Sequence, residues 1–281
     1  MTKLSHLTRY TAAACLGALA LASCGSSSSD ETPAAAPSGG PQLISADKLT
    51  VCTHLSYKPF EFKDDAGKVV GFDMDLANAA AKKLGATVAL VDIEFASITS
   101  GAVFAAKKCD IAMGAITIND ARKKAINFSN PYFSATQALL TKQSSGVTDL
   151  ASLKGKKVGV QTDTTGQAYA KEQADANGYE IVIFDDLPTE LTGLQAGRVD
   201  AIINDNGPLN DFAKSNTDYT VAKEFDTGEN YGFVGQKDDP NATKVMAAFN
   251  EALAASIADG SYKESYKTWF GAEPAVMPSA S

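Results

Sequence analysis

The stretch CDIAMGAITINDARKKAINFSNPYF, residues 109–133, carries the most informative pattern in the chain. Ile111, Met113 and Ala115 follow a charge-rich turn and predict a short buried strand. Asn119 or Asp120 provides a side-chain oxygen that can cap a helix beginning there. Arg122 then falls in the first helical turn, where free backbone N–H groups, the positive end of the helix dipole and a guanidinium group could together hold a carboxylate. Spacing alone leaves open the alternative that Arg122 is a solvated charge on a basic surface helix.

GAITINDARKKAINFSNPYF, residues 114–133, closely resembles the signature of the extracellular solute-binding proteins of family 3, receptors of ABC importers that take up polar amino acids. The resemblance covers about residues 47–271 and recurs, in the order of the family, in YKPFEF (57–62), GKVVGFDMDLANAAAKKLG (67–85), SLKGKKVGV (152–160), RVDAIIND (198–205) and DGSYKESYKTWFG (259–271). It implies an α/β chain with the type II periplasmic-binding-protein fold, in which two α/β lobes are joined by two hinge crossings. In that family the arginine binds the α-carboxylate of the ligand, so the resemblance assigns this role to Arg122.

The segment before this stretch alternates predicted strands with predicted helices. A β-rich run at residues 49–53 is followed by a helix that begins near Asp73 and stops at Gly85, and then by a second strand at residues 88–91. Such alternation predicts a parallel sheet with ligand chemistry at the carboxyl ends of its strands. Asp73 and Asp75 look like a paired-carboxylate site, but capping and dipole compensation explain two acids at a helix start.

The resemblance implies that the first lobe contributes ligand-binding residues directly after its strands: His54, Tyr57, Phe95, Gly114, Thr117 and Arg122. Tyr57 and Phe95 would form apolar walls around the ligand side chain, although ordinary core packing is the alternative for both. His54 is the only histidine outside the first 23 residues, and a lone histidine is usually structural. It stands where relatives that bind basic amino acids often carry an acid. We therefore expect His54 to line the site and to disfavour a basic ligand.

QTDTTGQAYA, residues 161–170, resembles the second anion-facing turn of the family, where a strand gives way to the N-terminus of a helix. Thr164 and Thr165, with their backbone N–H groups, would share the ligand α-carboxylate with Arg122. Plain helix capping is the alternative, and one residue can do both. Gln161 would face the ligand side chain.

GLQAGRVDAIIND, residues 193–205, repeats the layout of GAVFAAKKCDIAMG, residues 101–114: a helix, a basic turn, an aspartate and a buried strand. The repetition indicates that both lobes follow one β/α plan. Asp205 ends the later strand, and in the family this aspartate accepts a charge-assisted hydrogen bond from the ligand α-ammonium, worth about 1.5–3 kcal/mol. Without the resemblance it would be interpreted as part of an Asn-Asp-Asn-Gly turn. The neighbouring Asn204 would touch the ligand side chain.

The beginning of the chain predicts export and anchoring. Residues 1–23 combine a basic start, a short apolar run and a small-residue end, as in a secretory signal that is too short to span a membrane. LASC, residues 21–24, resembles the bacterial lipobox, which implies that Cys24 is lipidated and becomes the mature N-terminus. An ordinary signal with a chance cysteine is the alternative. Residues 24–45 are rich in Ser, Gly, Pro and Ala and predict a disordered tether.

The resemblance divides the rest of the chain into two lobes. Lobe 1 is expected to comprise residues 46–136 and 232–271, and lobe 2 to comprise residues 137–231, so that the chain crosses between the lobes twice. Residues 272–281 are expected to form a flexible tail.

Composition restricts the partners. Without residues 1–23 the chain has 23 basic and 33 acidic residues, a formal charge of −10, which argues against nucleic acid and against docking on anionic lipid through a basic patch. Beside Cys24, only Cys52 and Cys109 remain, too few with one histidine for a convincing zinc site, and we expect no metal and no cofactor. The family fold places the strands of Cys52 and Cys109 side by side. In an oxidising compartment this predicts a disulfide, with two buried thiols as the alternative.

The chain is therefore expected to be the substrate-binding lipoprotein of an ABC importer, and not an enzyme. A polar L-amino acid would be captured by lobe closure and delivered to the membrane permease. ATP hydrolysis would belong to a separate ATPase subunit, because the chain has no nucleotide-binding motif. We expect a monomer at the extracytoplasmic face of the bacterial cell membrane, held there by its lipid anchor only. The alternatives are an extracellular ligand-sensing domain and a dehydratase on the same scaffold, for which His54 is the obvious acid–base candidate.

The pocket composition also suggests which amino acid is bound. His54, Gln161 and Asn204 make a neutral-to-positive, hydrogen-bonding pocket, which favours glutamine, glutamate or asparagine over lysine or arginine. Three nearby acids would reverse this preference if their side chains point inward: Glu61, Asp92 and Glu94.

Overall fold

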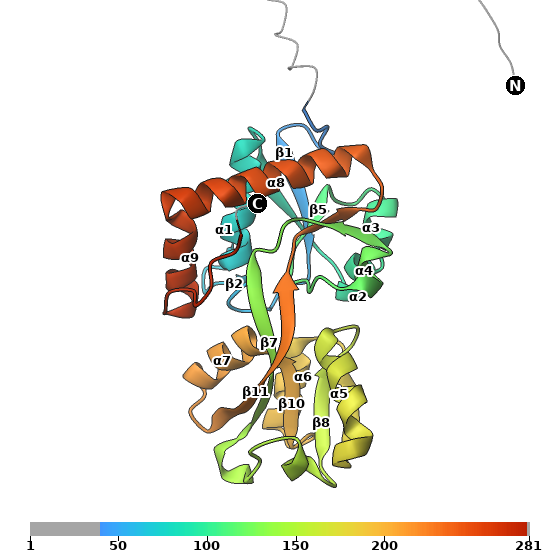
Figure 1. Ribbon diagram of the computed structural model, residues 1–281, viewed down its shortest axis with the longest axis vertical. Helices are drawn as coiled ribbons and strands as arrows, with labels where there is room; N and C mark the ends of the chain where they lie inside the picture. The colour runs from blue at the N-terminus through green and yellow to red at the C-terminus, as the bar shows by residue number, and fades with distance from the viewer. Residues whose placement is uncertain (1–39, 280–281) are drawn as a thin grey trace, which may run out of the picture. The chain divides into compact units, whose positions relative to one another are not determined.

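The structure, a computed structural model, describes residues 40–279. The expected signal at residues 1–23, Cys24 and most of the expected tether lie outside the described residues, as do residues 280–281. The described part contains two five-stranded sheets with helices packed on them, connected by two long neighbouring strands (Figure 1). None of the helices in this part of the chain has the length and apolar character of a membrane span.

The first sheet forms the centre of lobe 1 and has the strand order β4–β1–β5–β12–β6. Its strands are β1 (Lys48–Thr53), β4 (Thr87–Asp92), β5 (Ile111–Ala112), β6 (Ile126–Phe128) and β12 (Val234–Gln236). β1 pairs in parallel with β4 and β5, whereas β12 returns from late in the chain and pairs antiparallel with β5 and β6. The parallel strands end at one edge of the sheet, so the loops that follow them lie close together.

Helices and a short hairpin complete lobe 1. They are α1 (Phe72–Lys83), α2 (Phe95–Thr99), α3 (Ala102–Ala105), α4 (Asp120–Lys123), α8 (Pro240–Asp259), α9 (Ser261–Phe270), β2 (Phe62–Lys63) and β3 (Val69–Val70). The apolar faces of α1, α8 and α9 bury Phe72, Phe249 and Tyr262 in one aromatic-rich core. The C-terminal helices therefore belong structurally to the lobe that the N-terminal half begins.

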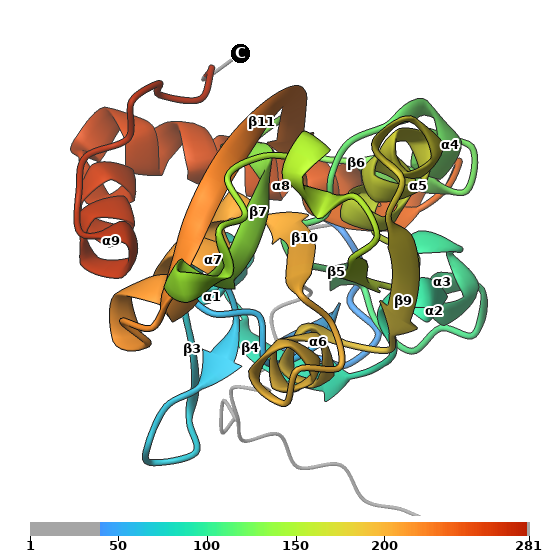
Figure 2. The same ribbon diagram turned by 90° about the horizontal axis from the view of Figure 1, so that it is seen from below.

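The second sheet forms lobe 2, with the strand order β11–β7–β10–β8–β9. Its strands are β7 (Phe133–Lys142), β8 (Lys157–Gln161), β9 (Glu180–Phe184), β10 (Ala201–Asp205) and β11 (Tyr219–Tyr231). Its helices are α5 (Thr165–Asn177), α6 (Leu187–Gln195), α7 (Asn206–Ser215) and the 3-10 turns η1 (Gln143–Ser145) and η2 (Ala151–Leu153). α5 and α6 cover opposite faces of this sheet (Figure 2) and pack in separate apolar cores.

β7 and β11 carry the chain between the lobes. They pair antiparallel over almost their whole length, from Lys142 opposite Tyr219 to Phe133 opposite Tyr231. The rings of Phe133 and Tyr231 stack with centroids 5.4 Å apart and belong to the core of lobe 1, whereas Leu140 belongs to a core of lobe 2. Each of the two strands thus has one end packed in lobe 1 and the rest packed in lobe 2.

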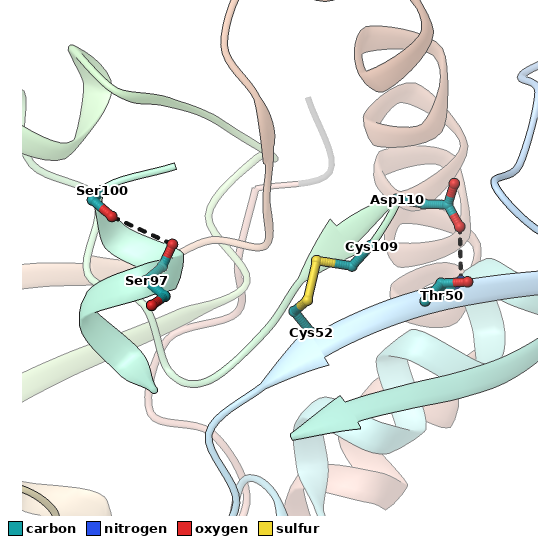
Figure 3. Close-up of a disulfide and its surroundings, with 6 residues drawn as sticks. All are labelled: Thr50, Cys52, Ser97, Ser100, Cys109 and Asp110. Carbon is teal, nitrogen blue, oxygen red and sulfur yellow. Dashed lines mark hydrogen bonds between the residues drawn. A yellow bond between two sulfur atoms is a disulfide. The ribbon is translucent and has the colours of Figure 1, made fainter. Parts of the chain in front are cut away.

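The predicted disulfide between Cys52 and Cys109 is present and joins β1 to the start of β5 (Figure 3). Beside it, the Thr50 N–H donates a hydrogen bond of 2.8 Å to the Asp110 carboxylate, which ties the same two segments together (Figure 3). Both cysteines are almost completely buried in the core of lobe 1. The disulfide therefore fixes the register of the two strands whose ends form the pocket described below.

Replacing both Cys52 and Cys109 by alanine is expected to lower the free energy of unfolding by about 2–4 kcal/mol, because the crosslink restricts a loop of 57 residues in the unfolded chain. Urea denaturation of the variant and of the oxidised protein measures the difference. The reduced wild-type protein is the control and should resemble the variant. Equal midpoints for the variant and the oxidised protein would contradict a stabilising disulfide.

The folded part begins earlier in the chain than the sequence indicated. Gln42, which was assigned to the tether, exchanges two hydrogen bonds of 2.7 Å with the side chain of Asn241. The Ile44 N–H donates to Asp110 at 2.8 Å. The last residues of the expected tether are thus fixed to lobe 1. The local sequence could not reveal this, because the partner of Gln42 lies 199 positions away and that of Ile44 lies 66 positions away.

Candidate ligand-binding site

A small pocket lies between the lobes, where the loops after β1 and β5 face the N-terminus of α5 and the end of β10. It is lined by His54, Tyr57, Glu61, Phe95, Gly114, Ala115, Thr117, Arg122, Gln161, Thr164, Thr165 and Asp205. These include every residue that the sequence predicted to bind the ligand except Asn204. Glu61 and Ala115 are additional.

Arg122 is buried at one end of the pocket and is not a solvated surface charge. Asn119 caps α4 by accepting from the Arg122 N–H at 2.8 Å, as predicted for one of the two candidate caps. The guanidinium donates to the Thr117 carbonyl at 3.0 Å and to the Asp163 carbonyl of lobe 2 at 3.1 Å, and it lies 5.2 Å from the centre of the Phe95 ring. Burial lowers the pKa of Arg122, while the carboxylates of Asp205 and Glu229 oppose this shift. The side chain thus presents a fixed positive charge to both lobes.

The N-terminus of α5 faces Arg122 from lobe 2. Thr164 is the N-cap of this helix and accepts from the Gln167 N–H at 3.0 Å, so the capping alternative applies to its hydroxyl. The backbone N–H groups of the first turn of a helix have no partner within the helix and attract anions. The Thr165 hydroxyl donates to Glu229 at 2.8 Å and lies 3.3 Å from the Thr117 hydroxyl of lobe 1.

Glu229, on β11, connects these groups and was not anticipated from the sequence. Its carboxylate accepts from the hydroxyls of Thr117 and Thr165, both at 2.8 Å, and from the Gln137 amide at 3.2 Å. One acid beside the crossing thus gathers donors from both lobes. Its one local partner is Thr227, whose hydroxyl donates to it at 3.0 Å, and its other partners come from three distant segments that no local pattern reveals.

Asp205 ends β10 and presents a second charge, of opposite sign to Arg122. It is buried and accepts hydrogen bonds from the Gln137 amide at 2.6 Å and from the Tyr231 hydroxyl. It occupies the N-cap position of α7 but makes no side-chain cap, so turn chemistry does not explain its orientation. Burial, followed by repulsion from Glu229, raises the pKa of the Asp205 carboxyl to about 6.

Four hydrogen-bond acceptor atoms on three side chains have no partner among the described residues and line another part of the pocket. Both carboxylate oxygens of Glu61 are buried with no partner among the described residues, and so are Nε2 of His54 and Oε1 of Gln161. His54 Nδ1 lies 3.1 Å from the Ile93 carbonyl, to which it donates, so Nε2 is the ring nitrogen that can accept a hydrogen bond. Burial and the nearby Asp73 raise the pKa of Glu61 well above its usual range.

Of the three acids whose direction the sequence left open, only Glu61 points inward. Asp92 and Glu94 are exposed and do not line the pocket. Asp92 instead accepts from the Leu55 N–H at 3.3 Å. Glu61 follows Phe60, which fills the core of lobe 1, and the closed turn at Tyr57–Glu61 directs the acid into the pocket. The expected neutral-to-positive pocket did not include Glu61. The carboxyl of this residue is buried in the pocket lining of lobe 1 without a partner among the described residues.

Asp73 has a different role from the one expected. The N-cap of α1 is Gly71, and Asp73 lies in the first turn with its side chain fully buried. Its carboxylate accepts from the N–H groups of Gly114 and Ala115, at 3.2 and 3.1 Å, and from the Tyr132 hydroxyl at 2.8 Å. Gly114 and Ala115 have φ angles of +144° and +47°, a region that side-chain-bearing residues rarely adopt. Asp73 thus holds the turn that lines the pocket, rather than capping a helix.

Asn204 does not line the pocket, in contrast to the expectation. Its side-chain oxygen accepts from the Tyr57 hydroxyl of lobe 1 at 2.7 Å, and its amide nitrogen donates to Glu190 at 2.7 Å. The residue therefore connects the lobes behind the pocket wall. Within residues 40–279, no three His, Cys, Asp or Glu side chains are grouped so that they could hold a metal ion.

Comparison with known proteins agrees with this geometry. Residues 49–272 match the family model of the bacterial extracellular solute-binding proteins, family 3. Among similar proteins, a probable histidine-binding protein of Neisseria gonorrhoeae is 32% identical, with 95% of this chain and 97% of that protein covered. The L-cystine-binding protein TcyJ of Escherichia coli K12 is also 32% identical, with 80% and 83% covered. An ancestral arginine-binding protein solved with arginine superposes with a TM-score of 0.74 at 37% identity, covering 80% of this chain and 99% of that one.

The family match spans most of the described residues, and the two-lobed α/β architecture is the one that the sequence predicted. The similar proteins are named as binding proteins, which does not support the dehydratase alternative. The relatives are substrate-binding proteins and not enzymes. The chain therefore belongs to the bacterial extracellular solute-binding proteins of family 3 and has their type II periplasmic-binding-protein fold.

Proposed function

We propose that this chain captures a free L-amino acid with a cationic side chain, such as arginine, by closure of its two lobes, and delivers it to the permease of an ABC importer. The observation that carries the choice of ligand is Glu61, whose carboxyl is buried in the pocket wall without a partner among the described residues. A buried carboxylate without a partner is costly, and a cation is the partner that relieves the cost. The proposal replaces the preference for glutamine, glutamate or asparagine, which rested on a pocket without Glu61.

The α-carboxylate of the ligand would lie against Arg122 and the N-terminus of α5. Two guanidinium nitrogens already donate to the carbonyls of Thr117 and Asp163, which holds the group in one orientation. The first-turn N–H groups of α5 supply donors from the other lobe, and the helix dipole favours an anion there. Thr164 contributes through this backbone, because its hydroxyl is used for the cap.

The α-ammonium would lie against Asp205. This carboxylate is oriented by Gln137 and Tyr231 and belongs to lobe 2, whereas Arg122 belongs to lobe 1. A zwitterion that contacts both residues therefore joins the lobes. Contacts that form only when both lobes touch the ligand favour the closed state.

The ligand side chain would extend between Tyr57 and Phe95 toward Glu61, His54 and Gln161. All three polar groups offer acceptors there, and a guanidinium carries five N–H donors and no acceptor. Glutamate would place a second carboxylate beside Glu61. Glutamine carries no charge that could pair with the Glu61 carboxylate. A dissociation constant near micromolar requires about 8 kcal/mol, which two charge-assisted clusters and burial of the side chain can supply.

The cellular setting is proposed from the sequence and from the family. A lipid on Cys24 and the tether of residues 24–41 would hold the protein at the extracytoplasmic face of the membrane, where a monomer meets the permease. ATP hydrolysis would take place in a separate subunit of the importer. The names of the relatives, which refer to histidine, cystine and arginine, support an amino acid as cargo.

Calorimetric titration of the purified protein, unfolded and refolded to remove bound ligand, tests the proposal against the twenty amino acids, ornithine and citrulline. Arginine, lysine or ornithine should bind with the highest affinity, and glutamate should not bind. If the folded protein preferred glutamine or glutamate, the assignment of Glu61 would be wrong. If it bound no amino acid, the receptor function itself would be refuted.

Affinity for arginine is expected to fall when the pH is lowered from 7.5 to 5. Asp205 must be ionised to hold the ammonium, and burial raises its pKa to about 6, so one pH unit below this value costs about tenfold in affinity.

The stability of the ligand-free protein should change in the opposite direction and increase as the pH is lowered over the same range. A carboxyl whose pKa is raised by folding contributes stability that is present at low pH and is lost as the pH rises through about 6. Titration and thermal unfolding over this range measure both effects, and a parallel fall of the two would indicate acid unfolding instead.

A further inference from the structure

The side-chain amide of Asn204 is held in one orientation by three hydrogen bonds. Its oxygen accepts from the Tyr57 hydroxyl at 2.7 Å and from the Asp205 N–H at 2.9 Å. Its nitrogen donates to Glu190 at 2.7 Å. A flipped amide would direct an N–H group at the Asp205 N–H, which can only donate. The observed orientation places the Asn204 oxygen 2.7 Å from the Tyr57 hydroxyl, where it accepts the hydrogen bond.

Glu190 is a completely buried acid on α6. Among the described residues, its carboxyl makes one hydrogen bond, which it accepts from the Asn204 amide. Burial raises its pKa to about 8; the hydrogen bond from Asn204 opposes this shift, and Asp205 and Asp186 add to it. Folding thus favours the protonated form of the group. An apolar side chain of similar size would avoid the cost of burying a carboxyl in this core. The contact with the Asn204 amide is therefore the interaction for which a carboxyl is needed at this position.

We propose that Glu190 is a positioning residue for lobe closure: it orients the Asn204 amide of lobe 2 so that its oxygen receives the Tyr57 hydroxyl of lobe 1. This hydrogen bond forms between the lobes without any ligand atom. It therefore contributes to the fraction of ligand-free molecules that are closed, and the observed affinity is proportional to that competent fraction. The effect on affinity rests on the proposed amino-acid binding, whereas the effect on closure does not.

A double-mutant cycle between Tyr57→Phe and Glu190→Leu tests the inference. Each single variant should weaken L-arginine binding by about three- to tenfold, as expected for the loss of one hydrogen bond. The double variant should be no weaker than either single variant, because both changes remove the same contact between the lobes. Glu190→Gln retains an oxygen for the Asn204 amide and resembles the neutral acid, so it should bind arginine within twofold of the wild type.

The closed fraction of the ligand-free protein provides a readout that a general loss of packing would not reproduce. Single-molecule energy transfer between dyes on α8 and α5 should show fewer closed molecules in Tyr57→Phe and Glu190→Leu, but not in Glu190→Gln. Additive effects of the two changes on affinity would overturn the proposal. A Tyr57→Phe variant with unchanged affinity and an unchanged closed fraction would also overturn the proposal. This second test does not require that Glu190→Leu folds. If the wild type did not bind arginine, the proposed ligand would be wrong, and the energy-transfer result would still decide the role of Glu190.

Discussion

The Arg122→Ala variant is expected to lose amino-acid binding by about 3–5 kcal/mol, which is roughly two to three and a half orders of magnitude in the dissociation constant. The guanidinium is buried, is fixed by two carbonyls from different lobes and is the only cation in the pocket lining. Its removal would leave the ligand carboxylate buried without its charge partner. Calorimetric titration with arginine measures the loss.

Lys123→Ala is the matched control, because Lys123 is the next residue of α4 and pairs only with the exposed Asp120 at the protein surface. It should bind as the wild type does. Arg122→Lys should lie between the two, since an ammonium keeps the charge but cannot reach both carbonyls in the planar geometry of a guanidinium. An Arg122→Ala variant that folds and binds within tenfold of the wild type would exclude Arg122 as the carboxylate site.

Glu61→Gln is expected to remove the preference for arginine over citrulline, which has the same shape without the charge. We expect arginine affinity to fall by about 2–5 kcal/mol, because the cation would be buried beside a neutral amide, while citrulline affinity changes little. The same variant should raise the melting temperature of the ligand-free protein at pH 8. The wild-type carboxyl has a raised pKa, so its ionised form destabilises the fold as the pH rises, and the amide does not ionise.

Glu94→Gln is the control for this experiment, since Glu94 is a nearby acid that is exposed and does not line the pocket. It should leave both affinities and the melting temperature unchanged. Equal losses for arginine and citrulline in Glu61→Gln would mean that Glu61 shapes the pocket without pairing with the ligand charge.

Much of this protein could be inferred from local sequence because the relevant interactions are local. The buried strand before Gly114, the Asn119 cap and the position of Arg122 follow from periodicity and capping within about a dozen residues. The ends of parallel strands meet at one edge of a sheet, so residues placed after β1 and β5 were expected to converge, and they do. The Cys52–Cys109 disulfide was predicted because the family fold places β1 and β5 side by side.

Only the tertiary structure decided the direction and the partners of the buried acids. Glu61, Asp73, Glu190 and Glu229 lie in ordinary helix, strand or turn positions, and nothing in their neighbouring residues distinguishes them from surface carboxylates. The partners of Asp73 and Glu229 are 41 to 112 positions away, except for Thr227, which lies two positions from Glu229. The partner of Glu190 is 14 positions away. The order of the elements and the residues at strand ends are thus determined by short-range periodicity. The charge of the ligand pocket depends on which side chains the packing of distant segments turns inward, because the free energy of a buried carboxyl is set by neighbours in space and not along the chain.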